Sequence, residues 1–361
     1  MRRAVRPLQG AVVRPEFHPL PIGEIEELTD DSVAITFEVP EELRAAYAFR
    51  AGQHLTIRTV AAGDDVRRSY SICSPEGSNR LRIGVKRLPG GAFSETALSQ
   101  LGVGDPVEVM TPMGHFGAAL EGAKRPAFVA AGSGITPVLS MAATALERDD
   151  VTEVLVLTCD RNQASMMFVE DLADLKDRFA ARLQVVQVLT REAQDSELLS
   201  ARLDAERLGQ ILDLLVPDER DGWFLCGPFD LVTMVHEVLL RREVAAEDVH
   251  TELFHAEAPV WVAIAEARGE GAEVLATLDG RQSAFTVPPG GLVLEALLGV
   301  RRDAPYACRG GVCGTCRARL VEGSVAMDAN WALEPDEVRR GYVLTCQSRP
   351  TSERLVLDYD G

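Results

Sequence analysis

Three of the seven cysteines in the 361-residue chain fall within nine residues, and this crowding constrains the fold more than any other feature. Cys308 and Cys313 are separated by four residues, Cys313 and Cys316 by two, and Cys346 follows after a further 29 residues. Glycines occupy the gaps between the first three cysteines, and glycine accepts positive φ and a close approach of the backbone. We therefore expect a tight loop that presents three sulfur atoms toward one centre, which the fourth sulfur completes.

The spacing C-x4-C-x2-C…C is that of plant-type [2Fe–2S] clusters, which need four thiolates around two irons and two bridging sulfides. Backbone N–H groups of a tight loop can hydrogen-bond to the sulfurs and raise the reduction potential. A structural zinc site is one alternative, but such sites usually pair their cysteines in short knuckles, and Cys346 has no second cysteine beside it. Four unrelated buried thiols are the other alternative. The spacing favours a cluster held by Cys308, Cys313, Cys316 and Cys346.

Composition narrows the class of protein further. A formal net charge of −18 argues against a nucleic-acid binder, which would carry a basic face, and leaves room for a partner with a basic docking patch. No run approaches the roughly 18 apolar residues of a membrane span, and the basic start lacks the apolar region of a signal peptide. Seven cysteines do not make a disulfide scaffold of a chain this long, so reduced thiols are expected. The expected location is the cytoplasm, with no membrane and no nucleic acid as partner.

The pattern of turns and apolar residues divides the chain into three domains. Short alternating strands separated by glycine-rich turns over 18–120 are typical of an antiparallel β-barrel. Strands that alternate with helices over 121–256 predict a doubly wound parallel sheet. The stretch 257–272, rich in Ala, Glu and Gly, is expected to be a linker that lets the last domain swing. With a β-hairpin and a helix at the start of 273–361, the expected fold class is multidomain, α+β and α/β.

The 273–361 segment, with its four cysteines, resembles a plant-type ferredoxin domain. The resemblance implies a β-grasp fold around the [2Fe–2S] cluster.

The stretch R-S-Y-S, residues 68–71, points to a flavin. Taken alone it could be an ordinary strand with a surface arginine. An arginine can grip a pyrophosphate with two hydrogen bonds, a tyrosine can stack on an isoalloxazine ring, and a serine hydroxyl can reach flavin N5. With AGQH upstream and GGAFS downstream, the segment resembles the FAD-binding domain of the ferredoxin–NADP reductase superfamily. The resemblance implies FAD contacts from Arg68, Tyr70 and Ser71, from the backbone of Gly91, Ala92, Phe93 and Ser94, and from Val85 and Lys86.

The stretch A-A-G-S-G-I-T-P, residues 130–137, follows a predicted strand and opens a helix. Glycines there let the backbone approach a pyrophosphate, and the helix N-terminus supplies N–H donors. Any glycine turn between a strand and a helix could look this way, but Gly132, Gly134 and Pro137 match the superfamily's G-x-G-I-x-P. The resemblance implies nicotinamide-nucleotide binding by these residues and places Thr136 close to the flavin.

Two further stretches match the same superfamily. Cys226-Gly227-Pro228 follows the last core strand, and family members place this cysteine over the nicotinamide, although a buried thiol at a strand end is the simpler interpretation of Cys226 alone. Glu252 and Phe254 match a glutamate-x-aromatic ending, in which the aromatic ring covers the flavin. For Phe254 a role in the core is the alternative. The predicted catalytic residues are Ser71, Cys226 and Glu252.

Coenzyme choice depends on groups near the adenosine ribose. A 2′-phosphate needs cationic and hydroxyl donors, and Thr190 and Arg191 resemble the S-R-E of NADPH-using reductases, to which Arg161 could add a contact. Asp160 argues the other way, because an acid near the ribose tends to favour NADH. The prediction is NADPH, with NADH as the alternative.

Longer stretches, 38–59 and 321–360, resemble the reductase subunits of phenylacetyl-CoA epoxidases in bacterial phenylacetate degradation. The resemblance implies an oxidoreductase that passes electrons from NADPH through FAD and the [2Fe–2S] cluster to a multisubunit di-iron oxygenase. The nearest alternative is the reductase of another oxygenase, such as a Rieske ring-hydroxylating system or an alkane or steroid monooxygenase. A sensor or scaffold that holds a cluster without oxidising NADPH is the alternative from another class, and the intact R-S-Y-S, G-S-G-I-T-P and C-G-P stretches argue against it.

Overall fold

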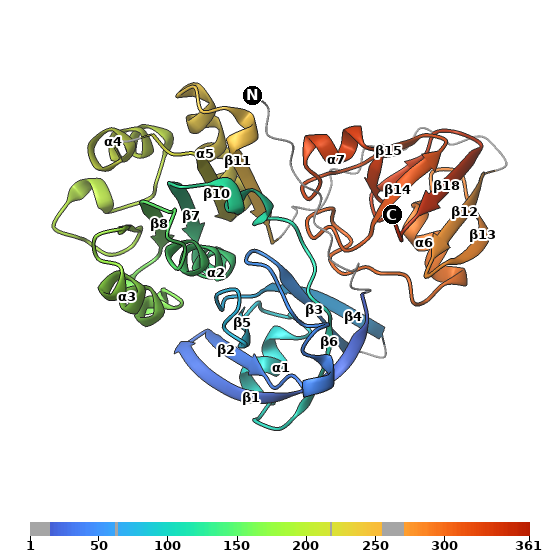
Figure 1. Ribbon diagram of the computed structural model, residues 1–361, viewed down its shortest axis with the longest axis horizontal. Coiled ribbons are helices and arrows are strands. Elements are labelled where there is room, and N and C mark those ends of the chain that lie inside the picture. The colour runs from blue at the N-terminus through green and yellow to red at the C-terminus, as the bar shows by residue number, and fades with distance from the viewer. Residues whose placement is uncertain (1–14, 62–63, 217–218, 255–270) are drawn as a thin grey trace.

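The computed structural model describes residues 15–61, 64–216, 219–254 and 271–361, and three sheets account for most of its strands (Figure 1). Each of the three predicted domains builds one of these sheets, and a small two-stranded sheet completes the third. The predicted linker, 257–272, lies outside the described residues except for its last two positions. No helix in the described ranges combines the length and the apolar character that a membrane crossing requires.

The first domain is an antiparallel barrel, as the sequence predicts. Its six strands are ordered β4-β3-β6-β1-β2-β5, and an isolated bridge between Ile72 and Ile83 joins the two outer strands. Inward-facing side chains such as Leu55, Ile57 and Ile35 form its core. The elements are β1 (Phe17–Thr29), β2 (Ser32–Phe37), β3 (His54–Ala61), β4 (Asp64–Ser71), β5 (Leu81–Lys86), α1 (Ser94–Ser99) and β6 (Pro106–Met110).

The second domain is a parallel sheet with strand order β11-β10-β7-β8-β9. Successive residues of β7 face opposite sides, so Phe128 packs in one core with α2 and α3, whereas Ala127 packs in the other with α4 and α5. The sheet is therefore covered on both faces, which confirms the doubly wound prediction. The elements are β7 (Pro126–Ala131), α2 (Ile135–Leu146), β8 (Val154–Asp160), α3 (Val169–Arg178), β9 (Leu183–Leu189), α4 (Ala205–Leu215), β10 (Gly222–Gly227), α5 (Phe229–Arg241) and β11 (Val249–Leu253).

The third domain packs one helix, α6, on a five-stranded sheet of order β13-β12-β18-β14-β16. The hairpin between β12 and β13 turns at Asp279 and Gly280, both with positive φ, which suits a tight primed turn. The elements are β12 (Ala272–Leu278), β13 (Arg281–Val287), α6 (Val293–Val300), β14 (Arg317–Glu322), β15 (Val325–Met327), α7 (Pro335–Arg339), β16 (Tyr342–Leu344), β17 (Ser348–Pro350) and β18 (Arg354–Asp358).

Single 3₁₀ turns occur between these elements. They are η1 (Glu41–Leu43), η2 (Ala118–Gly122), η3 (Gly132–Gly134), η4 (Gln163–Ser165), η5 (Glu197–Leu199) and η6 (Ala246–Asp248).

The first two domains are joined through a buried arginine. Arg82 of β5 donates a hydrogen bond of 2.7 Å to Asp171 of α3 and pairs with Glu26 of β1. Its guanidinium also lies 4.9 Å from the centre of the Phe168 ring, in the loop before α3. This contact brings the ends of the barrel strands β4 and β5 close to the carboxyl ends of the parallel strands.

Candidate functional site

A cavity of about 410 Å³ lies where the three domains meet. Its walls come from the end of β4, from β5, from the loop before α1, from the turn into α2, from the end of β11 and from the cysteine-rich loop. Most of the residues predicted to contact FAD line it: Arg68, Tyr70, Ser71, Lys86, Gly91, Ala92, Phe93, Ser94, Thr136, Glu252 and Phe254.

Val85 is the exception, because its side chain does not line the cavity. Successive side chains of a strand point to opposite faces, so Gly84 and Lys86 face the cavity while the Val85 side chain is fully buried in the barrel core, which leaves its backbone for the predicted contact. Gly84 also allows a close approach, because a Cβ there would meet Thr136 at 2.7 Å and the Phe168 ring at 2.8 Å.

The aromatic wall of the cavity is built by Tyr70 and Phe93, whose ring centres are 5.4 Å apart. Burial raises the pKa of Tyr70, so its phenol is neutral across the physiological range. Arg68 donates 2.8 Å to the backbone carbonyl of Arg67, which leaves the other nitrogen atoms of its guanidinium available to an anion in the cavity.

Ser71 and Glu252 connect the barrel to the parallel-sheet domain across this cavity. The Ser71 hydroxyl donates to the Glu252 carboxyl at 3.1 Å. Burial raises the pKa of Glu252 to about 8, against the lowering effect of the Ser71 hydrogen bond. A carboxyl that is protonated near neutral pH can hold a proton next to a reacting ring.

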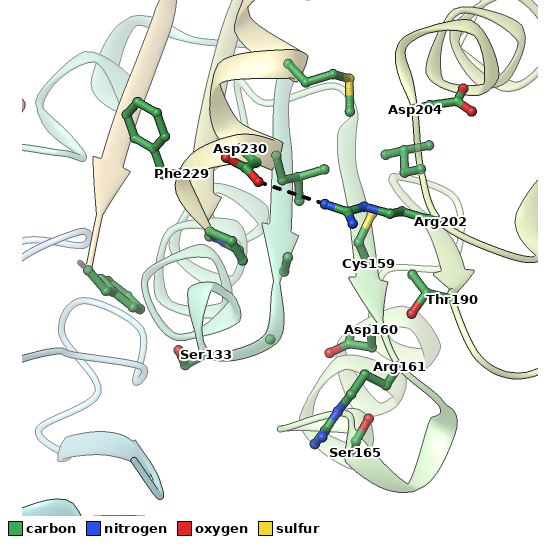
Figure 2. Close-up of a pocket in the computed structure, with 18 of the residues that line it drawn as sticks. Ser133, Cys159, Asp160, Arg161, Ser165, Thr190, Arg202, Asp204, Phe229 and Asp230 are labelled. Carbon is green, nitrogen blue, oxygen red and sulfur yellow. Dashed lines mark ion pairs between the residues drawn. The ribbon is translucent and has the colours of Figure 1, made fainter. Parts of the chain in front are cut away.

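A second cavity of about 820 Å³ opens at the carboxyl ends of the parallel strands (Figure 2). This is the edge where doubly wound sheets bind their ligands. The predicted nucleotide residues that line it are Gly132, Arg161, Thr190, Gly227 and Pro228, together with Ser165 and Phe254. Lys86, Ser133 and Phe254 line both cavities, so the two meet at these side chains.

Four predicted nucleotide residues do not line this cavity: Gly134, Pro137, Arg191 and Cys226. Gly134 packs on the neighbouring strand β10, since a Cβ at this position would lie 2.2 Å from the Cys226 carbonyl oxygen. Pro137 is buried within α2. The Arg191 side chain is exposed outside the walls. Cys226 is 1% exposed, and burial raises its thiol pKa well above the usual value, so the structure gives it a core position and does not support its prediction as a catalytic residue.

One end of this second cavity, where the coenzyme-choice residues of the sequence analysis lie, carries opposing charges. Figure 2 shows Asp160, Arg161 and Ser165 together there. Burial raises the pKa of Asp160 to about 6. Arg161 lies 3.3 Å from Asp31 of the barrel domain, so its charge is already partly neutralised.

Sequence reasoning missed three charged residues that line this second cavity, which we call the nucleotide cavity. Arg202 and Asp230 approach to 3.9 Å across its mouth, and both are largely exposed. Asp204 caps α4 by accepting a hydrogen bond of 2.8 Å from the Arg207 backbone N–H. The signal that could have identified them is their position in the chain. Asp230 follows shortly after β10, and Arg202 and Asp204 come directly before α4, where doubly wound sheets present side chains to ligands.

The four cysteine thiols of the third domain converge in two pairs. The Cys313 thiol hydrogen-bonds to Cys308, and the Cys316 thiol to Cys346, which lowers the pKa of Cys308 to about 7 and also lowers that of Cys346. The Gly310 backbone N–H donates to the Cys308 sulfur at 3.3 Å.

This donor set fits a binuclear cluster. Positive φ at Arg309, Gly311 and Gly314 winds the loop tightly around the sulfurs. Two thiol pairs with backbone N–H donors suit two bridged irons better than one zinc.

The cysteine-rich loop also forms part of the first cavity. Cys308, Gly310, Val312 and Cys313 line the same space as Tyr70 and Ser71. Val312 extends further, into the hydrophobic core of the second domain. Two of the four predicted cluster ligands, Cys308 and Cys313, therefore face the predicted flavin site directly.

Family models match each of the three domains. An oxidoreductase FAD-binding domain matches residues 19–117, an oxidoreductase NAD-binding domain residues 128–237, and a 2Fe-2S iron-sulfur cluster binding domain residues 276–351. Together they cover most of the chain, in the order that the sequence predicts.

Relatives match over nearly the full length. The chain is 37% identical to one of the subunits of 1,2-phenylacetyl-CoA epoxidase of Escherichia coli (strain K12), over 95% of this chain and 98% of that protein. It is 32% identical to the ferredoxin reductase component of 3-ketosteroid-9-alpha-monooxygenase of Rhodococcus rhodochrous, over 94% of this chain and 96% of that protein.

A solved structure shares the architecture. Phthalate dioxygenase reductase, described as a modular structure for electron transfer from pyridine nucleotides to [2Fe–2S], matches with a TM-score of 0.57 and 25% identity, over 95% of this chain and 98% of that one. The chain therefore belongs to the family of oxygenase reductase components, NAD(P)H-dependent oxidoreductases that carry an FAD-binding, an NAD-binding and a [2Fe–2S] domain on one polypeptide.

Proposed function

We propose that this chain is the reductase of a phenylacetyl-CoA epoxidase and delivers electrons from NADPH to its di-iron oxygenase. The observation that carries the proposal is the 37% identity to a component of a phenylacetyl-CoA epoxidase over almost the whole of both chains. The steroid monooxygenase reductase is less similar, at 32%. Because reduced thiolates and NADPH belong to a reducing compartment, we place the protein in the cytoplasm.

The domain boundaries that we propose are 18–120 for FAD, 121–256 for the nucleotide and 273–361 for the cluster, with 257–272 as the linker. The matched ranges of the three family models fall inside these boundaries.

In the first cavity, which we call the flavin cavity, we assign the FAD pyrophosphate to Arg68 and to the backbone N–H groups of the loop before α1. Tyr70 would stack on the isoalloxazine ring, and the Ser71–Glu252 pair would lie at its reactive edge. Bound FAD supplies the change from two-electron hydride chemistry to single-electron transfer, and the [2Fe–2S] cluster carries single electrons onward. The chain's own part is to hold, orient and exclude water around these groups.

Phe254 occupies the junction at which a nicotinamide ring would meet the flavin. It lines both cavities, so a ring entering from the nucleotide side has to displace it. The raised pKa of Glu252 keeps a proton available beside Ser71 at neutral pH.

The exit for electrons is the cysteine-rich loop. Two cluster ligands, Cys308 and Cys313, line the flavin cavity, which supports direct transfer from flavin to cluster within one chain. Cys346 and Cys316 form the other thiol pair of the cage.

The test is a reconstituted reaction with purified components. The chain is mixed with NADPH, phenylacetyl-CoA and the oxygenase subunits of a phenylacetyl-CoA epoxidase, and the epoxide-derived product is measured by mass spectrometry. We expect product only when both the chain and NADPH are present. The matched control replaces the epoxidase with a 3-ketosteroid oxygenase and its steroid substrate. Turnover of the steroid without turnover of phenylacetyl-CoA would contradict the proposal and favour the steroid alternative.

A further inference from the structure

An arginine of the barrel domain reaches into the segment that leads to the cluster. The side chain of Arg67, in β4, is 4% exposed. Its guanidinium lies over the Tyr306 ring, 4.0 Å from the ring centre, and donates to the Ala304 carbonyl at 3.4 Å. Tyr306 comes two residues before the cluster ligand Cys308, so Arg67 contacts the backbone that sets the position of the cysteine-rich loop.

Arg67 belongs to a stack of guanidinium groups and aromatic rings that crosses the domain boundary. On the barrel side, Arg67 and Arg58 both lie over the Phe17 ring, at 5.1 and 4.5 Å. On the ferredoxin side, Arg309 lies 4.6 Å from the Tyr306 ring centre. Cation–π attraction is strongest where water is excluded, and Arg67 and Tyr306 are the two members of the stack that are buried.

The barrel domain alone leaves the Arg67 charge poorly compensated. Arg58 stands directly opposite Arg67 in the β3–β4 ladder, and like charges in this position repel. Arg58 has Glu108 of its own domain as a partner at 2.5 Å. Among the described residues, the ion pair of Arg67 within the barrel domain is a longer one of 3.2 Å with Asp65, and its Nε stays without a hydrogen-bond partner even with the domains docked. Tyr306 and Ala304 of the ferredoxin domain add the ring contact and the carbonyl acceptor that the barrel domain does not supply.

We propose that Arg67 is a positioning residue for electron transfer, which docks the ferredoxin domain so that its cluster loop faces the flavin. The inference rests on the proposed transfer of electrons from flavin to cluster. It identifies a contact that keeps the cysteine-rich loop beside the flavin cavity. Other contacts also hold the ferredoxin domain: His54 of the barrel lies 3.5 Å from Thr315, and Phe229 of the second domain packs on Trp331 with ring centres 5.2 Å apart. Arg67 differs from these in carrying a buried charge whose compensation depends on docking.

The test is the variant Arg67→Glu in the full chain. A carboxylate at this position faces the negative face of the Tyr306 ring and the Ala304 carbonyl, so the docked arrangement loses its attraction and gains repulsion. After anaerobic mixing with NADPH in a stopped-flow instrument, flavin reduction keeps its wild-type rate. The subsequent reduction of the cluster slows by about tenfold or more, because less of the chain is docked at any moment.

Arg58→Glu is the matched control. It makes the same change of charge over the same Phe17 ring, but Arg58 is paired with Glu108 on the barrel side. Its rate of cluster reduction stays within about twofold of wild type, because the Arg67–Tyr306 contact remains and surface charge changes have small effects. The EPR spectrum and the iron content of the cluster stay unchanged in both variants, which separates loss of docking from damage to the cluster.

The outcomes are distinguishable. Equal rates of cluster reduction in Arg67→Glu and wild type, with normal flavin reduction, overturn the docking role. A wild-type chain whose flavin is not reduced by NADPH instead contradicts the proposed function. If Arg67→Glu does not fold, Tyr306→Leu removes the aromatic face from the other side, and an unchanged rate of cluster reduction in that variant overturns the inference equally.

Discussion

At the scale of single residues, we propose that coenzyme choice depends on one partly buried carboxyl. Asp160 lines the nucleotide cavity beside Arg161, and burial raises its pKa to about 6. Below this pH the carboxyl is neutral and tolerates a 2′-phosphate, and above it the negative charge repels one. Arg161, the nearest cation of the predicted set, lies close to Asp31, so it offsets this repulsion only in part.

The first prediction concerns Asp160→Asn. In the wild type, the ratio of kcat/KM for NADPH to that for NADH falls as pH rises from 5.5 to 7.5, because Asp160 ionises in this range. The variant loses this part of the pH dependence, and its ratio at pH 7.5 rises by about tenfold, the size of one close charge repulsion in a partly buried site. Steady-state kinetics with both coenzymes measures it. A ratio with the same pH dependence in both proteins would show that Asp160 does not face the ribose.

At the scale of elements, the turn from β7 into α2 shows what sequence reasoning could and could not reach. The G-x-G-I-x-P pattern predicted a strand, a glycine turn and a helix, and the structure has all three in order. The pattern predicted that both glycines contact the nucleotide. The structure gives that position to Gly132 and uses Gly134 to let β10 approach, because no Cβ fits against the Cys226 carbonyl. Whether a glycine is needed for a ligand or for packing depends on a strand 92 residues away, which no local pattern reports.

The second prediction compares two glycines of the same domain. Gly134→Ala forces a methyl group to within 2.2 Å of the Cys226 carbonyl oxygen, so the turn after β7 must move away from β10 and the apparent Tm of the domain falls by several degrees. Gly209→Ala in α4 meets only the end of Arg242 at 3.9 Å, and it stabilises the helix by about 0.5–1 kcal/mol. Differential scanning calorimetry of both variants measures this. A Gly134→Ala protein that is as stable as wild type would contradict the packing described for this turn.

Local patterns predicted some strands and strand faces of the barrel and not others, because they do not report which distant neighbours a strand packs against. The barrel was predicted from short alternating strands, and the apolar residues of β2, β3 and β5 do alternate along the sequence. Strand β1 lacks this pattern, since its two prolines and mixed polarity hide a strand that lies between β6 and β2. The Val85 side chain lies outside the cavity because strand geometry exposes only alternate residues to it, whereas the stretch was matched as a whole.

At the scale of the whole molecule, charged contacts between domains stabilise the arrangement in which the domains enclose the two cavities. Arg82 links the barrel to α3 through Asp171, and its own side chain is only 6% exposed. A buried charge that loses a partner stays desolvated without compensation, so such a contact affects stability more than an exposed ion pair does.

The third prediction is that Asp171→Asn lowers the free energy of unfolding by about 1–3 kcal/mol, the contribution of a hydrogen bond to a charged group. Asp230→Asn is the control, because its pair with Arg202 is exposed and 3.9 Å long, and it changes stability by less than about 0.5 kcal/mol. Urea unfolding followed by tryptophan fluorescence compares them. An equal effect of the two substitutions would show that the Arg82 contact does not join the domains in solution.

The arrangement of the three domains is the part that the sequence could predict least. The cysteine spacing predicted the cluster ligands, and the flavin and nucleotide motifs predicted most of the residues in the two cavities. That Cys308 and Cys313 line the flavin cavity, and that Arg67 lies on Tyr306, depends on side chains of separate domains meeting in space. No periodicity within one domain carries this information.

The central claim is that electrons from NADPH reach the cluster through the flavin of the same chain. The most direct measurement is an anaerobic addition of NADPH to the purified chain, with the flavin and cluster absorbance bands followed separately, in the wild type and in Cys346→Ser. The account predicts that both bands bleach in the wild type, the flavin first, and that only the flavin band is present and bleaches in the variant. A wild-type cluster that stays oxidised after the flavin is fully reduced would contradict it.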